Sequence, residues 1–169
     1  MQLCLADRLA SGSFADVFTP APREKAYKIF RRIQDPVLAH VAPYVFEAEV
    51  QAQRIAAVVP ELRKHVPSFF GTVQVSKVLD HTGADISAQY WVQLCYAMEC
   101  LSHDPEERKL GSFFNQQEWH FVQPLEELFG EAGINHLGDA SVFYWRTASP
   151  ILIDFAVSDA AADHARSGA

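Results

Sequence analysis

Cysteine is scarce in this chain, and the short motifs that mark the commonest metal and nucleophile sites are missing. Only three cysteines occur among 169 residues, and Cys4, Cys95 and Cys100 have no metal-type spacing. They therefore predict free thiols in a reducing compartment and exclude a disulfide scaffold. The seven histidines form no H-x-x-x-H or H-E-x-x-H pattern, and neither G-x-S-x-G nor an intact P-loop occurs. The sequence thus lacks the usual signatures of zinc enzymes, α/β-hydrolases and P-loop proteins.

Long apolar runs are also missing. No stretch approaches the roughly 20 apolar residues that a membrane-spanning helix needs, and the first residues lack the basic segment of a signal peptide. The chain is 49% hydrophobic and 21% charged, which is an ordinary globular composition. Because its length is near that of one typical domain, we expect a single domain in the cytoplasm with no membrane contact.

Basic residues are few in the second part of the chain. Residues 1–98 carry 10 basic and 9 acidic groups, a net charge of +1, whereas residues 99–169 carry 4 basic and 12 acidic groups, a net charge of −8. Nucleic acids and anionic lipids bind clustered lysine and arginine, so the acidic part argues against both as partners. It predicts either a solvated acidic face or a docking surface for a basic protein.

The hydrophobic pattern predicts an α+β order. Three short strand-like runs are followed by a helix over residues 43–59, with Pro43 in its first turn and apolar residues at helical spacing. Two more strands, a second helix with a kink at Pro124 and a final β-hairpin complete the chain. The expected strands are residues 3–9, 15–20, 25–32, 69–79, 88–101, 141–145 and 150–156, and the second helix covers residues 116–130.

The turn after the first strand resembles the Gly-rich loop of protein kinases, G-x-G-x-x-G-x-V. Residues 10–17 read ASGSFADV, so Ala10 and Ala15 stand where the family has its first and third glycines. Glycine allows backbone N–H groups to approach phosphates without an intervening Cβ atom. The resemblance implies nucleotide contacts from four residues of this segment: Gly12, Ser13, Phe14 and Val17. The alternative is an ordinary Gly/Ser turn between two strands.

The next strand is similar to the V-A-I-K strand of the same family. Residues 26–30 read AYKIF, and a lysine among apolar strand residues needs a partner or a path to solvent for its ammonium. The resemblance implies that Lys28 holds the α- and β-phosphates of ATP and is paired with a glutamate of the following helix. Glu49 matches the family spacing best, and Glu47 is the second candidate.

The end of the strand over residues 88–101 resembles the kinase hinge. Met98 takes the gatekeeper place, and the resemblance implies that Met98, Glu99 and Leu101 contact the adenine, with residues 99–101 presenting their backbone to it. The alternative is a buried strand whose apolar side chains only fill the core.

The final strand resembles the segment that carries the D-F-G motif. Residues 150–156 read PILIDFA, so Ala156 replaces the glycine. An aspartate directly after four apolar residues is costly to bury without a cation or hydrogen-bond donors nearby. The resemblance implies that Asp154 holds Mg²⁺.

The catalytic-loop motif H-x-D-x-x-x-x-N has several possible alignments in residues 133–143. If His136 takes the place of the motif histidine, Gly138 falls where the catalytic aspartate belongs. With one inserted residue, Asp139 becomes the general base. If the alignment is anchored on the following strand instead, Ser141 replaces the metal-binding asparagine and Asp139 becomes a second metal ligand. A turn aspartate is the alternative for Asp139.

Together these features identify the chain as a protein-kinase-like α+β domain over residues 1–158. We expect an antiparallel five-stranded N-lobe with one helix (about 1–98), a truncated, mostly helical C-lobe ending in a β-hairpin (about 99–158) and a tail (159–169). Only 15 residues follow Asp154, which leaves no room for an activation segment or substrate lobe. In this the chain resembles compact bacterial effector or phage kinases, which implies possible delivery into a host cell.

The resemblance implies binding of ATP and Mg²⁺ and transfer of the γ-phosphate to a hydroxyl of a protein or small molecule. The alternative is a catalytically inactive, pseudokinase-like module that acts by binding a partner protein through its acidic second part. An α+β domain unrelated to kinases is the third interpretation.

Overall fold

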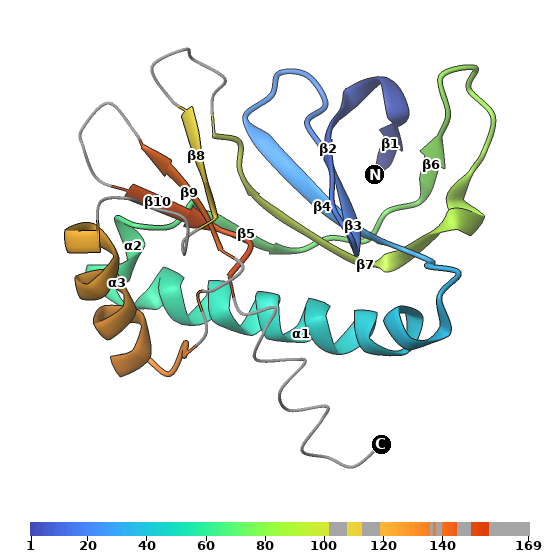
Figure 1. The fold of residues 1–169 in the computed structure, drawn as a ribbon. Coiled ribbons are helices and arrows are strands. Elements are labelled where there is room, and N and C mark those ends of the chain that lie inside the picture. Colours follow the sequence, from blue (N-terminus) through green and yellow to red (C-terminus); the bar gives the residue numbers. More distant parts are fainter. Residues whose placement is uncertain (102–107, 113–118, 136, 138–139, 145–149, 156–169) are drawn as a thin grey trace. The chain divides into compact units, whose positions relative to one another are not determined.

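The computed structural model describes residues 1–101, 108–112, 119–135, 137, 140–144 and 150–155 (Figure 1). The chain forms two compact units. The first consists of Met1–Phe46 and Phe69–Leu101, and the second of Glu47–Ser68 and Ser102–Ala169. Helix α1 (Pro36–Val58) contributes its first half to one unit and its second half to the other.

A five-stranded antiparallel sheet forms the framework of the first unit, which confirms this part of the prediction (Figure 1). Its spatial order is β2-β3-β4-β7-β5. The strands are β2 (Arg8–Ser11), β3 (Ala15–Phe18), β4 (Lys25–Arg31), β5 (Phe69–Thr72) and β7 (Tyr90–Glu99). Consecutive hairpins link β2, β3 and β4, and helix α1 lies between β4 and β5 in the chain.

A separate two-stranded parallel sheet was not predicted. Strand β1 (Gln2–Cys4) pairs with β6 (Lys77–Leu79), so that Leu3 lies opposite Val78. The single strand expected over residues 3–9 is wrong, because a 3₁₀ turn (Leu5–Asp7) separates β1 from β2. The strand expected over residues 69–79 likewise divides into β5 and β6. A second 3₁₀ turn (Ser87–Gln89) leads into β7.

The two faces of the five-stranded sheet bury different partners. One face packs with β1 and β6 into an apolar core made of Leu3, Phe18, Ile29, Val75, Val78, Tyr90 and Cys95. The other face carries Phe30 and Tyr96, whose ring centroids lie 5.5 and 6.3 Å from that of Phe46 on α1. Because side chains alternate along a strand, neighbouring residues of β3 and β4 face these two environments in turn.

Helix α1 begins seven residues earlier than the sequence pattern predicted. Asp35 caps it, with its Oδ1 accepting from the backbone N–H groups of Val37 at 2.9 Å and Leu38 at 3.1 Å. Pro36 then occupies the first helical position, where its missing N–H has no cost. The expectation that Pro43 starts the helix is therefore wrong, since Pro43 lies inside it.

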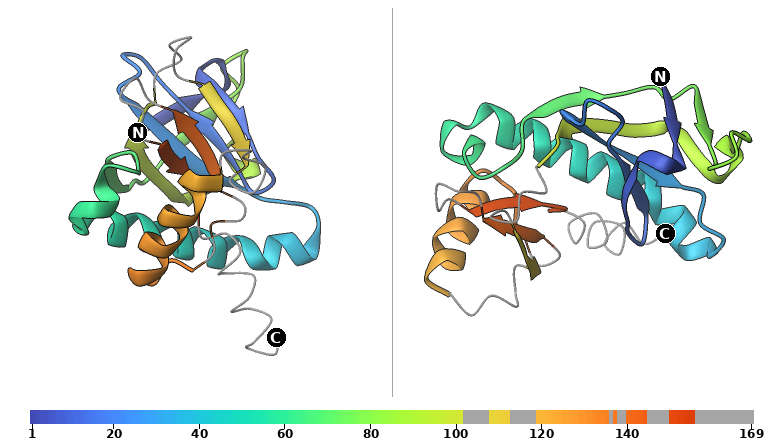
Figure 2. Two further views of the ribbon diagram at one scale, coloured as in Figure 1. Left: turned by 60° about the vertical axis from the view of Figure 1, so that its left-hand side comes forward. Right: turned by 90° about the horizontal axis from the view of Figure 1, so that it is seen from above.

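The second unit combines helices with a three-stranded antiparallel sheet of order β10-β9-β8. Its elements beyond α1 are α2 (Pro60–Arg63), β8 (Arg108–Ser112), α3 (Trp119–Glu131), β9 (Ser141–Tyr144) and β10 (Pro150–Ile153). The final hairpin is confirmed, whereas β8 was not predicted and adds a strand to a part expected to be mostly helical. Figure 2 shows α3 beside this sheet, and Leu125 and Phe129 of α3 pack on Leu152 of β10 in one core. No helix within the described residues has the length and apolarity to cross a bilayer.

Substitution of the α1 cap tests the observed helix start. We expect Asp35→Ala to lower the free energy of unfolding by about 1 kcal/mol, because two N–H groups of the first turn lose their acceptor. Asp35→Asn is the matched control and should retain most of the stability, since asparagine caps as well as aspartate does. Urea denaturation followed by circular dichroism measures both. An equal loss in the two variants would contradict the capping role.

Candidate functional site

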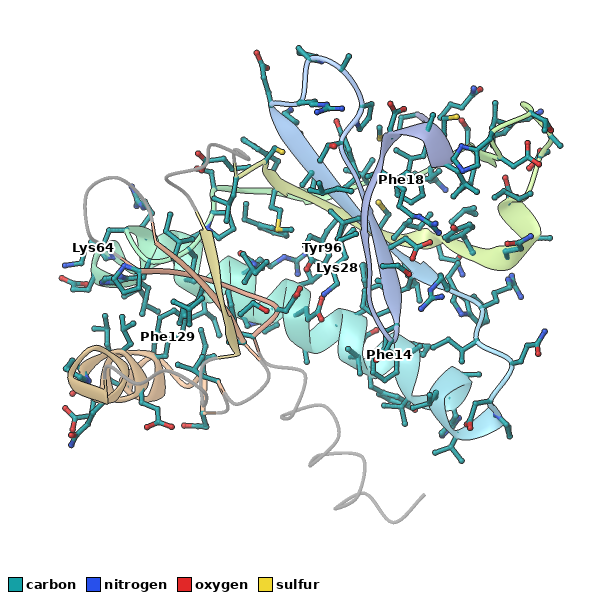
Figure 3. The ribbon with its side chains drawn as sticks, turned by 45° about the horizontal axis from the view of Figure 1, so that its top comes forward. Phe14, Phe18, Lys28, Lys64, Tyr96 and Phe129 are labelled. Carbon is teal, nitrogen blue, oxygen red and sulfur yellow. The ribbon has the colours of Figure 1, made fainter. Side chains whose placement is uncertain are left out.

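Lys28 is a buried cation in the middle of the five-stranded sheet. It lies on β4, and only 8% of the residue is exposed. In the strand register it pairs with Val17 on β3 and with Tyr96 on β7 (Figure 3). Its Nζ is 5.9 Å from the centre of the Phe30 ring. Burial of an ammonium has a large desolvation cost, so lysine is seldom found in a core position of this kind.

Small and apolar side chains share the sheet face with Lys28. Val17 on β3 pairs directly with Lys28. Ala26 lies two residues before Lys28 on β4 and pairs with Met98 on β7. Directly opposed residues of an antiparallel pair project to the same side of the sheet. We call this set, Val17, Ala26, Lys28, Tyr96 and Met98, the Lys28 face. The structure thus brings together Val17, Lys28 and Met98, three residues singled out from the sequence.

The turn between β2 and β3 carries three further predicted residues: Gly12, Ser13 and Phe14. The N–H of Gly12 donates to the carbonyl oxygen of Ala15 at 2.8 Å, which closes the turn, and Figure 3 shows Phe14 at this end of the hairpin. A Cβ atom built on Gly12 would lie 3.6 Å from that same oxygen, an ordinary contact, and its φ is not in the left-handed region. The fold itself therefore does not require glycine here.

The remaining predicted contacts of the first unit lie at the end of β7. Glu99 is the last residue of this strand and pairs with Lys25 in the register. Cys100 continues the contact, since its N–H donates to the carbonyl oxygen of Glu24 at 3.0 Å. Glu99 and Leu101 are half-buried and follow directly on Met98 of the Lys28 face.

A buried carboxylate on the opposite face was missed in the sequence. Asp16 is only 1% exposed. Its Oδ1 accepts from Ser11 Oγ at 2.6 Å, and its Oδ2 accepts from Tyr90 Oη at 2.7 Å. Arg8 Nη1 lies 3.5 Å from Oδ2, and Arg31 Nε lies 3.5 Å from Oδ1. We call these five residues the Asp16 cluster. Its one sequence signal was an aspartate two residues before Phe18, on the apolar side of an alternating strand.

The Asp16 cluster holds the β2–β3 turn through Arg31. The guanidinium Nη2 donates to the carbonyl oxygens of Gly12 and Ser13, the latter at 3.1 Å. Burial raises the pKa of Tyr90 well above its usual value of about 10, and the hydrogen bond to Asp16 raises it further. Tyr90 is therefore a permanent donor to Asp16 at neutral pH.

Three predicted site residues that the structure describes belong to the second unit. Glu49 on α1 is buried. Ser141 is the first residue of β9 and pairs with Ile153 of β10. Asp154 is the next residue after Ile153, so the hairpin register places Ser141 near it. Asp154 has φ of 58°, a left-handed conformation that costs energy in a residue other than glycine and is often found at functional sites. Asp139 lies outside the described residues.

His65 holds the strand that leads to Asp154. Its Nδ1 lies 3.0 Å from the carbonyl oxygen of Pro150, and its own carbonyl oxygen accepts from the N–H of Leu152 at 2.8 Å. Both bonds reach the outer edge of β10, which is the edge strand of its sheet. Burial lowers the pKa of His65; the hydrogen bond to Pro150 opposes this effect, and the charge of Lys64 adds to it. The neutral ring is therefore favoured, and the carbonyl acceptor places its proton on Nδ1.

Within the residues that the structure describes, no three His, Cys, Asp or Glu side chains gather into a metal-binding group. Mg²⁺ does not need such a group, because it is commonly held by one or two carboxylates together with substrate phosphates. Comparison of the chain with protein-family models, with curated proteins and with solved structures finds no match. The chemistry of the site must therefore be argued from its residues.

Removal of the Tyr90 hydroxyl tests the Asp16 cluster. We expect Tyr90→Phe to lower the free energy of unfolding by about 1–3 kcal/mol at neutral pH, because a buried carboxylate loses a donor. Because the pKa of Tyr90 is raised in the folded state, its protonated hydroxyl stabilises the fold fully below pH 10. This stabilisation is lost as the pH rises above 10. The difference in free energy of unfolding between wild type and Tyr90→Phe should therefore become smaller above pH 10, as measured by urea denaturation. Tyr27→Phe, a change in the same core, is the control; a gap independent of pH would contradict the raised pKa.

Proposed function

We propose that the first unit binds ATP on the Lys28 face and that the chain is a kinase-like phosphotransferase. The observation that carries the proposal is the buried ammonium of Lys28, which shares its face with Val17, Ala26 and Met98. A cation among apolar and aromatic side chains offers a nucleotide what it needs, with the charge for the phosphates and the apolar part for the base.

The chain order of the elements supports the kinase-like character. A glycine turn joins the first two strands of the sheet, Lys28 lies on the third, and the helix that follows carries Glu49. In protein kinases the lysine of the third strand pairs with a glutamate of the next helix. Asp154 follows the last strand of a hairpin, as the metal-binding aspartate of the family does. The Lys28–Glu49 ion pair itself stays a prediction of the resemblance.

Each residue of the proposed site has a role in binding or positioning. Lys28 neutralises the α- and β-phosphates, and Gly12 allows the turn to approach them, because it has no Cβ atom between its backbone and the ligand. Met98 packs beside the base, while the backbone of Glu99 and Leu101 offers it hydrogen bonds. Asp154 and Ser141 supply hard oxygen ligands of the kind that Mg²⁺ prefers. The bound ATP·Mg²⁺ supplies the phosphoryl group, and catalysis in such sites is mostly positioning and charge neutralisation.

A second candidate is a pseudokinase-like module that binds a nucleotide or a protein partner without phosphoryl transfer. Ala15 favours it, because its side chain is buried at a position where the family has a glycine. A Cβ atom there restricts how closely the turn can approach a phosphate. The two candidates differ in catalysis, and a protein partner or substrate fits both.

The binding part of the proposal is tested with paired lysine variants. We expect Lys28→Met to weaken ATP binding about tenfold to a hundredfold, because charged hydrogen bonds to phosphate contribute about 1.5–3 kcal/mol. Lys25→Met is the matched control on the same strand: Lys25 is exposed, lies on the opposite side of the pleat and packs over Phe70 at 4.6 Å. Isothermal titration calorimetry measures both. Equal affinities in the two variants would exclude the Lys28 face as the binding surface.

The catalytic part is tested at the predicted metal ligand. We expect Mg²⁺-dependent release or transfer of the γ-phosphate in the wild type, and a loss of at least about a hundredfold in Asp154→Asn, because the metal loses a charged ligand. ATP binding in the absence of Mg²⁺ should persist in the variant. ATP binding without any turnover in the wild type would favour the pseudokinase-like candidate.

A further inference from the structure

Arg31 lies between a buried carboxylate and the turn that joins β2 to β3. Its Nε is 3.5 Å from Asp16 Oδ1, and its Nη2 donates to the carbonyl oxygens of Gly12 and Ser13. The backbone N–H of Arg31 donates to the carbonyl oxygen of Phe14 at 2.9 Å. One residue therefore contacts three successive carbonyl groups of the turn.

The direction of these carbonyl groups fixes the direction of the amides that follow them. In a planar trans peptide the C=O of one residue and the N–H of the next point to opposite sides. Because the carbonyl oxygens of Gly12 and Ser13 face Arg31, the N–H groups of Ser13 and Phe14 point away from it. Successive N–H groups that point the same way form an anion-binding concavity in turns of this kind.

We propose that Arg31, anchored by Asp16, is a positioning residue that fixes the turn over residues 12–14 and thereby sets its affinity for the phosphates of ATP. The inference rests on the proposed function, since it assigns the turn to the phosphates of that ligand. Arg31 acts through the backbone and leaves direct phosphate contact to the N–H groups of the turn.

A tether of this kind orders the turn in advance, whereas a flexible glycine-rich loop has to be ordered by its ligand. A glycine-rich loop can approach phosphates closely, but the ligand must then remove the conformational freedom of each glycine. The planar guanidinium, by contrast, presents its donors in a rigid fork and holds two carbonyl oxygens before any ligand arrives. A turn ordered in advance binds its ligand more tightly, because less conformational entropy is lost on binding.

Arg8 provides a matched control within the same cluster. Its Nη1 lies 3.5 Å from Asp16 Oδ2, the distance that also separates Arg31 from Oδ1. Arg8 thus shares the carboxylate with Arg31, and among the hydrogen bonds of the described residues its side chain donates to Asp16, whereas that of Arg31 donates to the turn. Substitution of either arginine removes one ion pair from Asp16, and only the Arg31 change releases the carbonyl groups of Gly12 and Ser13.

The first experiment measures ligand affinity in three variants by isothermal titration calorimetry. Arg31→Met and Arg31→Lys should each lose about tenfold in ATP affinity, since lysine keeps the charge beside Asp16 but lacks the fork. Their adenosine affinity should stay within about twofold of wild type, because adenosine has no phosphates for the turn. Arg8→Met should retain the affinity for both ligands. An equal loss in Arg8→Met, or a loss of adenosine affinity in the Arg31 variants, would overturn the positioning role.

The second experiment needs no ligand and separates this inference from the proposed function. Amide hydrogen exchange at Gly12, whose N–H donates to the carbonyl oxygen of Ala15 and closes the turn, is followed by NMR. It should be faster in both Arg31 variants than in wild type and unchanged in Arg8→Met. Unchanged exchange in Arg31→Lys would overturn the tether whatever the ligand. If the wild type binds no ATP, the proposed function fails, while the exchange rates still decide whether Arg31 fixes the turn.

Discussion

A single buried carboxylate ties four strands of the five-stranded sheet together. Asp16 on β3 accepts hydrogen bonds from Ser11 of β2 and Tyr90 of β7 and forms ion pairs with Arg8 of β2 and Arg31 of β4. An ionised carboxylate without such partners is strongly disfavoured in a protein interior. The register that satisfies Asp16 is therefore selected by polar chemistry as well as by apolar packing, and any slip of β2, β3 or β4 breaks part of the cluster.

This register also decides which face of the sheet carries the positive charge. Asp16 pairs with Ile29, whereas the next residue, Val17, pairs with Lys28, so the pleat separates the carboxylate from the ammonium. A shift of one residue would exchange the two faces of a strand. Lys28 would then point into the core with Phe18 rather than share a face with Val17 of β3 and Met98 of β7. On the proposed function, the Asp16 cluster and the Lys28 face are two consequences of one strand pairing.

Local patterns predicted the elements of this fold better than their boundaries and contacts. Alternating apolar residues predicted the antiparallel strands and the final hairpin. The start of α1 was missed because Pro43 fits a first turn as well as Pro36 does, and only the Asp35 cap distinguishes them. The Asp16 cluster was missed for a different reason: Asp16 and Tyr90 are 74 residues apart, and no local pattern reports a contact that only tertiary structure creates. Lys28 and Asp154 were singled out through the order of motifs along the chain, which carries no geometry, and their roles stay predictions.

The alanine at position 15, where the Gly-rich pattern has a glycine, has a physical explanation in the sheet. Ala15 pairs with Phe30 and is buried, so its methyl group contributes to the sheet in a position where glycine would weaken it. On the proposed function, Arg31 holds the carbonyl groups of the turn before the ligand arrives, so flexible glycines at positions 10 and 15 are not needed. Gly12 places no Cβ atom between the backbone and a phosphate, at a position where the fold would tolerate one. On this proposal, the alanines of the hairpin and the Arg31 tether are two parts of one arrangement.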